Sequence, residues 1–488
     1  MKQDKGAAFD FGNDFKADFP GQFILSRPRR VHAPGWTAQR GDRWCLWRNH
    51  AERTCRIVDL HGTPIGWFLG IGVDCDGVLI TDLLRLPYDS QNGQGLRASE
   101  TRIEQIAGRW LVILDAPDLH RIYCDPVGDF SCLYNARDQL VAPSTLLCLG
   151  RPMEWNGAFE RDRILAGTMH FSLQQAADPA LRRMVPNHYL DLDQFTCVRH
   201  WPRTRTPLLA PQISVEDNMT QIDQRLKQVV SAICRGLPVT FPISGGRDSR
   251  NLLCAAGADA AHIMTSFSMS FHKMSRHDAE IGQAVAARLN VPHRVIPYSA
   301  TTPQQLQDYQ RRTGFMDGGS GAHLVGTQMA LPAGHVQLRG NVMELLRANQ
   351  WVGKVSTGAA IYPNYGLKRL LIDTQCSVSD LVERWRKPYM AWIGSLPAAH
   401  RARHLDFGFL EHLLPNTLGA RHFGVTNSFI MNPFADRRLI QLAIQIPPEI
   451  RMTDQPNQIL LASNAARLAD IPFDRSYYMS ETKSLAAA

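Results

Sequence analysis

A segment rich in glycine and serine, Ser244-Gly245-Gly246-Arg247-Asp248-Ser249, has the residue types that bind a phosphate group. The apolar run 237–243 before it predicts a strand, and the residues from about Ser249 onward predict a helix. At such a junction the backbone N–H groups are unpaired and the helix dipole favours an anion. The glycines let phosphate reach the backbone. Ser244 and Ser249 add hydroxyl donors, and Asp248 offers a hard oxygen ligand for the Mg²⁺ that accompanies a nucleoside triphosphate.

The loop differs from the nucleotide loop in which a lysine follows the last glycine, because Arg247 and Asp248 stand after Gly246. An ordinary glycine-rich turn is the alternative interpretation. The strand expected before the loop and the helix expected after it favour a phosphate-binding loop.

The elements around the loop alternate between strand and helix. Further strands are predicted near 262–265, which Ser266 follows, near 294–296 and near 336–338, with a helix through 279–289. This alternation predicts a parallel sheet with helices on its faces, an α/β fold. Beyond about residue 350 the apolar spacing is mostly helical.

The first part of the chain has a different pattern, with short segments of strand type at 65–70, 78–80, 110–114 and 121–124. It predicts layered sheets with few helices. Prolines and polar residues in 201–211 separate the two patterns, so we predict one domain over residues 1–205 and a second over 213–488.

The loop resembles the pyrophosphate loop of the asparagine synthetases, the tRNA-thiolating enzymes and related ATP pyrophosphatases, which split ATP into AMP and pyrophosphate. Residues 108–114, 125–128 and 185–190 resemble parts of that family's N-terminal glutaminase-like domain. The resemblance implies a degenerate Ntn-hydrolase-like domain of layered sheets over 1–205. It also implies an adenine-nucleotide alpha-hydrolase-like parallel sheet with a helical extension over 213–488.

The segment Gly340-Asn341-Val342-Met343-Glu344 resembles the family's glycine-rich acidic motif. The resemblance implies that Glu344 is a second ligand of Mg²⁺ or pyrophosphate, beside Asp248. Arg347 could bind phosphate or a substrate carboxylate, or be a surface arginine. We therefore expect Asp248, Glu344 and Arg347 to be catalytic. The residues expected to bind ATP are Ser244, Gly245, Gly246, Arg247, Asp248, Ser249, Ser266 and Gly340.

The chain departs from the family pattern at several positions. Lys2 stands where glutamine-using members have a nucleophilic cysteine, so the first domain is expected to be a scaffold or a substrate-recognition element. Asn457 stands where amide-forming relatives carry a lysine, so either another cation such as Lys354 or Arg451 supplies the missing charge, or the reaction is unusual or absent.

Two arginines stand beside the loop at positions where the asparagine synthetases usually have apolar or small residues. Arg247 and Arg250 suit a more anionic substrate, or they form local salt bridges.

These features predict an ATP-dependent carbon–nitrogen ligase that adenylates a small-molecule or peptide carboxylate for attack by an amine, without its own active glutaminase. The beta-lactam synthetases and lasso-peptide cyclases are related enzymes that close a ring within one molecule. A non-catalytic nucleotide-binding member of the family is one alternative. An RNA-modifying enzyme is another, although the basic strip and cysteine pair that it would need are not evident.

The composition fits a soluble globular protein, with 44% hydrophobic and 20% charged residues. No run of about 18 apolar residues predicts a membrane span, so a cytoplasmic protein is expected. The net charge of +8 is a small excess over 488 residues and does not imply nucleic acid. The ten cysteines form no Cys-x-x-Cys pair and are expected to be core thiols. The sequence leaves open whether the chain forms a homo-oligomer.

Overall fold

A computed structural model describes residues 9–10, 19–49, 53–204, 214–316, 320–351, 363–464, 468 and 470–473. The strands are β1 (Phe9–Asp10), β2 (Phe23–Ser26), β3 (Val31–His32), β4 (Thr37–Arg40), β5 (Cys45–Arg48), β6 (Thr54–Val58), β7 (Pro64–Val73), β8 (Leu83–Arg85), β9 (Ala107–Ala116), β10 (Leu119–Cys124), β11 (Leu133–Asn135), β12 (Leu140–Ala142), β13 (Arg182–Arg183), β14 (His188–Asp191), β15 (Thr196–Arg199), β16 (Val239–Pro242), β17 (Ile263–Ser270), β18 (His293–Pro297), β19 (His335–Leu338) and β20 (Ser428–Met431).

The helices are α2 (Leu96–Glu104), α3 (Arg161–Leu165), α4 (Val215–Gly236), α5 (Arg247–Ala255), α6 (Lys273–Leu289), α7 (Pro303–Arg312), α8 (Ser320–His323), α9 (Val325–Gln328), α10 (Pro363–Arg369), α11 (Val378–Ser395), α12 (His404–Gly408), α13 (Arg437–Gln445), α14 (Pro448–Arg451) and α15 (Gln455–Asn464). The predicted α/β class is therefore confirmed. Among the described residues, no helix combines the length and hydropathy needed to cross a bilayer.

The N-terminal half forms two sheets whose strands are mostly antiparallel. One has the order β15-β14-β10-β9-β7-β6-β8 and the other β13-β11-β12-β2-β5-β4. Along β7 and β9, alternate side chains enter two different cores: Trp67 and Ile113 pack with Phe23, while Trp110 packs with Ile103 of α2. Both faces of these long strands are therefore buried. The predicted strand at 78–80 is wrong, because that segment forms a single bridge between Leu79 and Val73.

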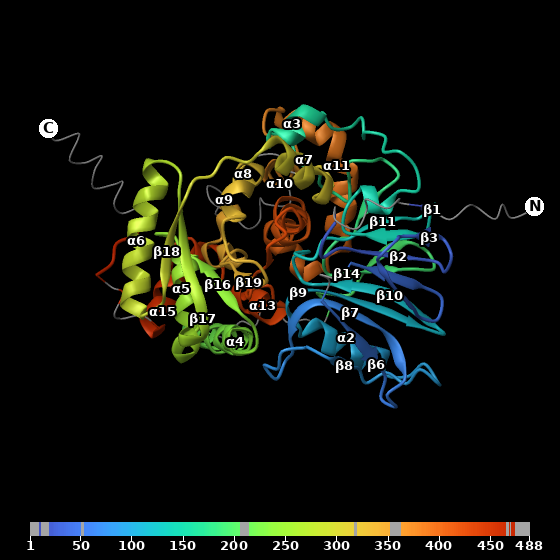
Figure 1. Cartoon of the computed structure of the whole chain (residues 1–488), viewed down its shortest axis with the longest axis horizontal. Coiled ribbons are helices and arrows are strands. Elements are labelled where there is room, and N and C mark those ends of the chain that lie inside the picture. Colours follow the sequence, from blue (N-terminus) through green and yellow to red (C-terminus); the bar gives the residue numbers. More distant parts are fainter. Residues whose placement is uncertain are drawn as a thin grey trace, which may run out of the picture.

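The C-terminal half contains a parallel sheet with the order β18-β17-β16-β19-β20. Helix α4 precedes it and is capped by Ser214, whose Oγ accepts from Asp217 N at 3.0 Å. The predicted strands near 262–265, 294–296 and 336–338 are confirmed as β17, β18 and β19. Figure 1 shows this sheet with α5 and α6 on one side of the molecule, the N-terminal sheets on the other, and α13 between them.

Buried polar contacts join the two halves. Gly108 N donates to Ala435 O at 2.9 Å, and Arg225 Nη1 donates to Asp74 O at 2.9 Å. Arg437, the first residue of α13, donates from Nη2 to Cys124 O at 3.0 Å. The parallel sheet is therefore fixed against the N-terminal sheets. The predicted division between 205 and 213 falls between β15 and α4, in a segment outside the described residues.

Candidate active site

The loop rich in glycine and serine joins β16 to α5 at the carboxyl edge of the parallel sheet. Gly246 is the N-cap of α5, and no described side chain caps this helix. Ser244 N donates to Ser249 Oγ at 3.2 Å, and Gly246 N donates to Ser244 Oγ at 3.2 Å. Side-chain contacts of this kind can be exchanged for contacts to a ligand. The N-terminus of α5 therefore has the properties of an anion-binding site.

A second segment follows β19 and packs directly against this loop. A Cβ added at Gly340 would lie 2.8 Å from the carbonyl carbon of Asp248, so only glycine permits the close approach. The turn of Met343–Arg347 lies between two residues with positive φ, Val342 at 72° and Ala348 at 46°. Such a φ is rare for a β-branched residue, and strain of this kind is concentrated at functional sites.

Two carboxyl groups, those of Asp248 and Glu344, come together where the two segments meet. Arg347 forms an ion pair with Asp248 Oδ2, whereas Asp248 Oδ1 is buried without a hydrogen-bond partner among the described residues. Asn341 Nδ2 donates to Glu344 Oε1 at 3.4 Å, and Glu344 Oε2 has no described partner. Burial raises the pKa of Asp248 to about 7 although Arg347 opposes the shift, and it also raises the pKa of Glu344.

The oxygens that lack partners fit a hard divalent cation. A carboxylate oxygen buried without a donor is costly, and Mg²⁺ takes oxygen ligands of this type. Asp248 Oδ1 and Glu344 Oε2 are therefore the atoms that would hold it, as the sequence predicts. Arg347 is brought to the same place, but its described contact is with Asp248.

A cavity of about 540 Å³ opens beside these groups. Its wall includes five of the predicted residues: Ser244, Asp248, Ser249, Gly340 and Glu344. Sequence reasoning missed other polar residues of the wall, which include Ser268, His272, Asp278, Gln328, Gln337 and Arg339. Of these, Asp278 Oδ1 accepts from Gly245 N at 3.3 Å, so it holds the loop from the side of α6.

Ser266 is not in the cavity wall. Its Oγ lies 2.9 Å from Pro292 O and 2.9 Å from His293 Nδ1, so it serves the pairing of β17 with β18. The strand β17 extends to Ser270, and Ser268 is the serine of this strand that lines the cavity. The strand runs five residues past its predicted end at Thr265, and Ser268 lies two residues, one repeat of a strand, beyond Ser266.

Arg247 and Arg250 form local contacts outside the cavity wall. Arg247 Nε lies 2.5 Å from Asp454 Oδ2, and the guanidinium lies over Phe473. Arg250 is buried and donates to Ile471 O and Pro472 O, both at 2.9 Å. Of the two interpretations of these arginines, the structure favours the local one. Their contacts join α5 to Asp454 and to residues 471–473.

Asn457 and Arg451 both have internal partners. Asn457 is fully buried; it accepts from Asn251 Nδ2 at 3.2 Å and donates to Asp454 Oδ1 at 3.0 Å. Arg451 is buried in a bidentate pair with Asp406, at 3.0 and 2.8 Å, so it is not the substitute cation. Lys354 lies outside the described residues. Among the described residues, Arg339 is the cationic side chain in the cavity wall.

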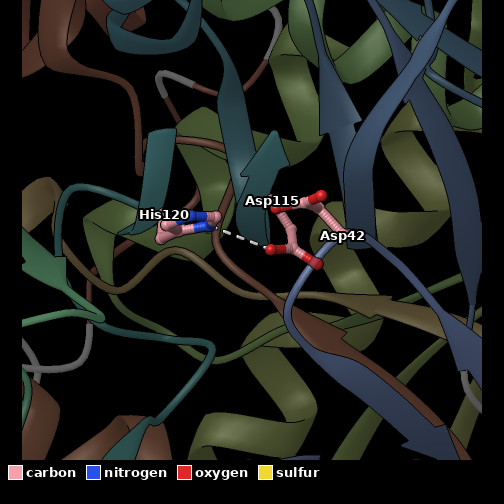
Figure 2. Close-up of side chains that lie close together, drawn as sticks. All are labelled: Asp42, Asp115 and His120. Carbon is pink, nitrogen blue, oxygen red and sulfur yellow. Dashed lines mark hydrogen bonds and ion pairs between the residues drawn. The ribbon is translucent and has the colours of Figure 1, made fainter. Parts of the chain in front are cut away.

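The N-terminal half contains another group of ligand-type side chains, Asp42, Asp115 and His120, shown in Figure 2. Their ligand atoms lie within 4.8 Å of one another. Asp115, however, accepts from Trp44 N at 3.0 Å, from Arg43 N at 3.2 Å and from His120 Nδ1 at 2.9 Å. Its oxygens are used to hold the turn before β5, and Asp42 is exposed. This group is a structural cluster.

Comparisons with known proteins add little. No protein-family model matches the chain, and none of the curated proteins is similar. Among solved structures, an NMN synthetase from Francisella tularensis aligns at 11% identity and a TM-score of 0.18, over 28% of this chain and 59% of that protein's length. At this level of similarity we take nothing about fold, substrate or activity from it.

Proposed function

We propose that the chain is an ATP-dependent ligase that adenylates a carboxylate and joins it to an amine. The proposal rests on one observation above all. Two acidic side chains, Asp248 and Glu344, present buried oxygens without described partners beside the uncapped N-terminus of a helix that follows a parallel strand. That combination suits a triphosphate together with a divalent cation.

In this proposal a carboxylate oxygen of the substrate attacks the α-phosphorus of ATP, and pyrophosphate leaves. The amine then attacks the acyl carbon, and AMP leaves with formation of an amide. The first-turn amides of α5 and the hydroxyls of Ser244 and Ser249 would bind the pyrophosphate portion, and Arg347 would stabilise its developing charge. Mg²⁺ held by Asp248 and Glu344 would neutralise charge on the phosphates.

We also propose a fold type for each half of the chain. The paired sheets before residue 200 would be a degenerate Ntn-hydrolase-like domain that no longer releases ammonia. The parallel sheet would be of the adenine-nucleotide alpha-hydrolase type. The acid would be a specialised small molecule or a peptide, with the amine supplied from solution or from the same molecule.

The test is the formation of AMP and pyrophosphate from Mg-ATP in the presence of a panel of acids. We expect wild type and Glu383→Gln, an exposed substitution on α11, to release both products with at least one acid, and Glu344→Gln to lose at least about 100-fold. ADP and phosphate as the products, or full activity in Glu344→Gln, would refute the assignment.

One observation favours a second function, a nucleotide-binding protein without turnover. Asn457 is internally paired, and Arg451 is held by Asp406. ATP that stabilises the protein while no acid or amine yields AMP would support this second function.

A further inference from the structure

A second cavity, the junction cavity, lies between the two halves of the chain and has a volume of about 160 Å³. Its wall includes His335 and Ser428, the first residues of β19 and β20, which are paired in register at the amino edge of the parallel sheet. The cavity beside Asp248 lies at the other end of β19, roughly 13 Å along the strand. No described residue lines both cavities. The junction cavity is therefore separate from the candidate active site.

The charged side chains in the wall of the junction cavity are two arginines of the N-terminal half, Arg53 and Arg109, and no described carboxylate lines it. Arg109 Nη1 donates to Ile430 O at 3.1 Å, and its guanidinium lies 4.5 Å from the ring centroid of Phe423 and 4.6 Å from that of Phe429. These contacts hold the guanidinium against the C-terminal half. Arg53 is exposed, and no described carboxylate lies within ion-pair distance of it. The wall therefore carries positive charge that suits an anion.

One buried acid near Arg109 offsets this charge only in part. Asp129 does not line the cavity, and burial together with the neighbouring Asp125 raises its pKa to about 7, although Arg109 lowers it. Asp129 is therefore incompletely ionised at neutral pH. The two imidazoles of the wall, those of His335 and His422, are neutral, because burial lowers the pKa of both. The cavity thus keeps an excess of positive charge.

Neutral polar groups give the wall both donors and acceptors. Ser428 Oγ has no hydrogen-bond partner among the described residues. Asn427 Nδ2 donates to Gln328 O and to Leu331 O, both at 3.0 Å, so its Oδ1, which has no described partner, can only accept. The neutral imidazole of His335 offers one donor and one acceptor. A ligand that matches this wall needs several acceptor oxygens for the arginines and the hydroxyl, and one donor for Asn427 Oδ1.

We propose that the junction cavity binds inorganic phosphate as hydrogen phosphate, held between the two halves of the chain. The unprotonated oxygens of this ion accept from Arg53, Arg109 and Ser428 Oγ, and its P–OH group donates to Asn427 Oδ1. A volume of about 160 Å³ equals that of roughly five waters at about 30 Å³ each, which suits a single small ion better than a nucleotide. The site lies apart from the proposed adenylation and does not depend on it.

The experiment follows the thermal unfolding temperature of the full chain while phosphate is added at pH 8 and constant ionic strength. An ion that contacts both halves binds the folded state and raises this temperature. We expect Arg53→Gln to raise the midpoint concentration of the titration by about tenfold, as for one lost charged hydrogen-bonding partner, and Ser428→Ala to raise it by about threefold. Without phosphate, Ser428→Ala should unfold at the temperature of wild type, because its hydroxyl has no described partner to lose.

Two other anions test the role of Asn427. At pH 8 sulfate and methyl phosphate are fully ionised, whereas hydrogen phosphate keeps one proton. We expect both to have midpoints at least about tenfold above that of phosphate, because Asn427 Oδ1 is then left without a donor. Equal midpoints for the three anions would overturn the assignment to hydrogen phosphate.

Two further variants show where the phosphate binds. Arg294→Gln, a substitution of an exposed arginine on β18, is the matched control for charge and should titrate as wild type. Ser249→Ala, in the loop before α5, should also titrate as wild type, because it lies outside the junction cavity. The proposal is overturned by any of three results: no rise in the unfolding temperature with phosphate, equal midpoints in Arg53→Gln and Arg294→Gln, or a midpoint that shifts in Ser249→Ala and not in Arg53→Gln.

Discussion

Two acidic side chains in this molecule have opposite environments. Glu411, in the π-helical turn Phe409–Leu413, receives hydrogen bonds on both oxygens: from Arg199 at 2.7 and 2.8 Å, from Trp392 at 2.7 Å and from Asn187 at 3.1 Å. Asp248, in the loop before the cavity, has one oxygen paired with Arg347 and the other without a described partner.

The pKa values follow the partners. Burial alone would raise both, but the donors around Glu411 lower its pKa to about 2, whereas the pKa of Asp248 rises to about 7. A carboxylate that is fully paired inside the protein has no capacity left for a ligand, and its removal leaves its partners buried without a counter-charge. A carboxylate that is incompletely paired contributes little to the fold and is available for chemistry.

The largest expected effect is on stability at Glu411. Arg199 belongs to β15 and Glu411 to the C-terminal helical region, so Glu411→Gln leaves a buried guanidinium without its charge partner across the junction. We expect a loss of about 4 kcal/mol of unfolding free energy, measured by urea denaturation at pH 7. Asp470, which forms an exposed bidentate pair with Arg288, is the control, and Asp470→Asn should leave the unfolding free energy close to that of wild type. Equal losses in the two variants would contradict the distinction.

Lowering the pH should remove the contribution of Glu411 to the unfolding free energy. The pKa of Glu411 is lowered in the folded state, so its stabilisation is complete above the ordinary value of 4.5 and is lost as the pH falls toward about 2. We expect a loss of about 3 kcal/mol over that window. The neighbouring imidazoles His188 and His412 have pKa values lowered to about 4 and about 3, and they lose stability in the same direction. The difference between wild type and Glu411→Gln isolates the carboxylate, and parallel pH profiles would contradict its role.

Asp248→Asn should change activity much more than stability. Because burial opposes the charge of Asp248 more strongly than Arg347 supports it, its removal should not lower the unfolding free energy at pH 7 by more than about 1 kcal/mol. Release of AMP should fall by about 100-fold, since the side chain would no longer hold the cation. The measurements are urea denaturation and product quantification on the same preparation. A large loss of stability with activity retained would make Asp248 a structural residue.

The sequence predicted the elements that carry the site better than it predicted the site itself. The strands β16, β17 and β19 and the helices α5 and α6 follow from apolar runs and alternation, because these patterns reflect burial directly. The loop at Ser244 and the motif at Gly340 then lie at the carboxyl ends of adjacent strands, where their side chains meet. Topology of this kind can be inferred from order along the chain.

The remaining residues depend on register and side-chain direction, which the sequence does not give. Gln337 lies within the strand predicted near 336–338 and Arg339 follows it, and only the packed structure shows that both residues border a cavity. Arg247 and Arg250 lie beside the loop in sequence, yet the fold directs them to Asp454 and the C-terminal segment. A basic residue near a motif does not reveal which way it points.

Gly340→Ala tests whether the contact between the two segments matters to the site. The added Cβ would lie 2.8 Å from the carbonyl carbon of Asp248, so one of the segments must move. We expect a loss of about 2 kcal/mol of stability and a fall in AMP formation of about tenfold. The control is Gly394→Ala in α11, where no atom lies within 4 Å of an added Cβ. Equal behaviour of the two variants would show that the close approach is dispensable.

The smallest effect is expected at the structural cluster in Figure 2. Asp42 is exposed and Asp115 is already used by backbone donors, so Asp42→Asn should change the unfolding free energy by less than about 0.5 kcal/mol. Mg²⁺, Mn²⁺ or Zn²⁺ should not raise the unfolding temperature of wild type above that of Asp42→Asn. A cation that stabilises wild type alone would make this cluster a metal site. Cation binding would then occur at a carboxylate whose oxygens already accept hydrogen bonds. That result would contradict the rule drawn from Glu411 and Asp248, in which only an incompletely paired carboxylate is available to a ligand.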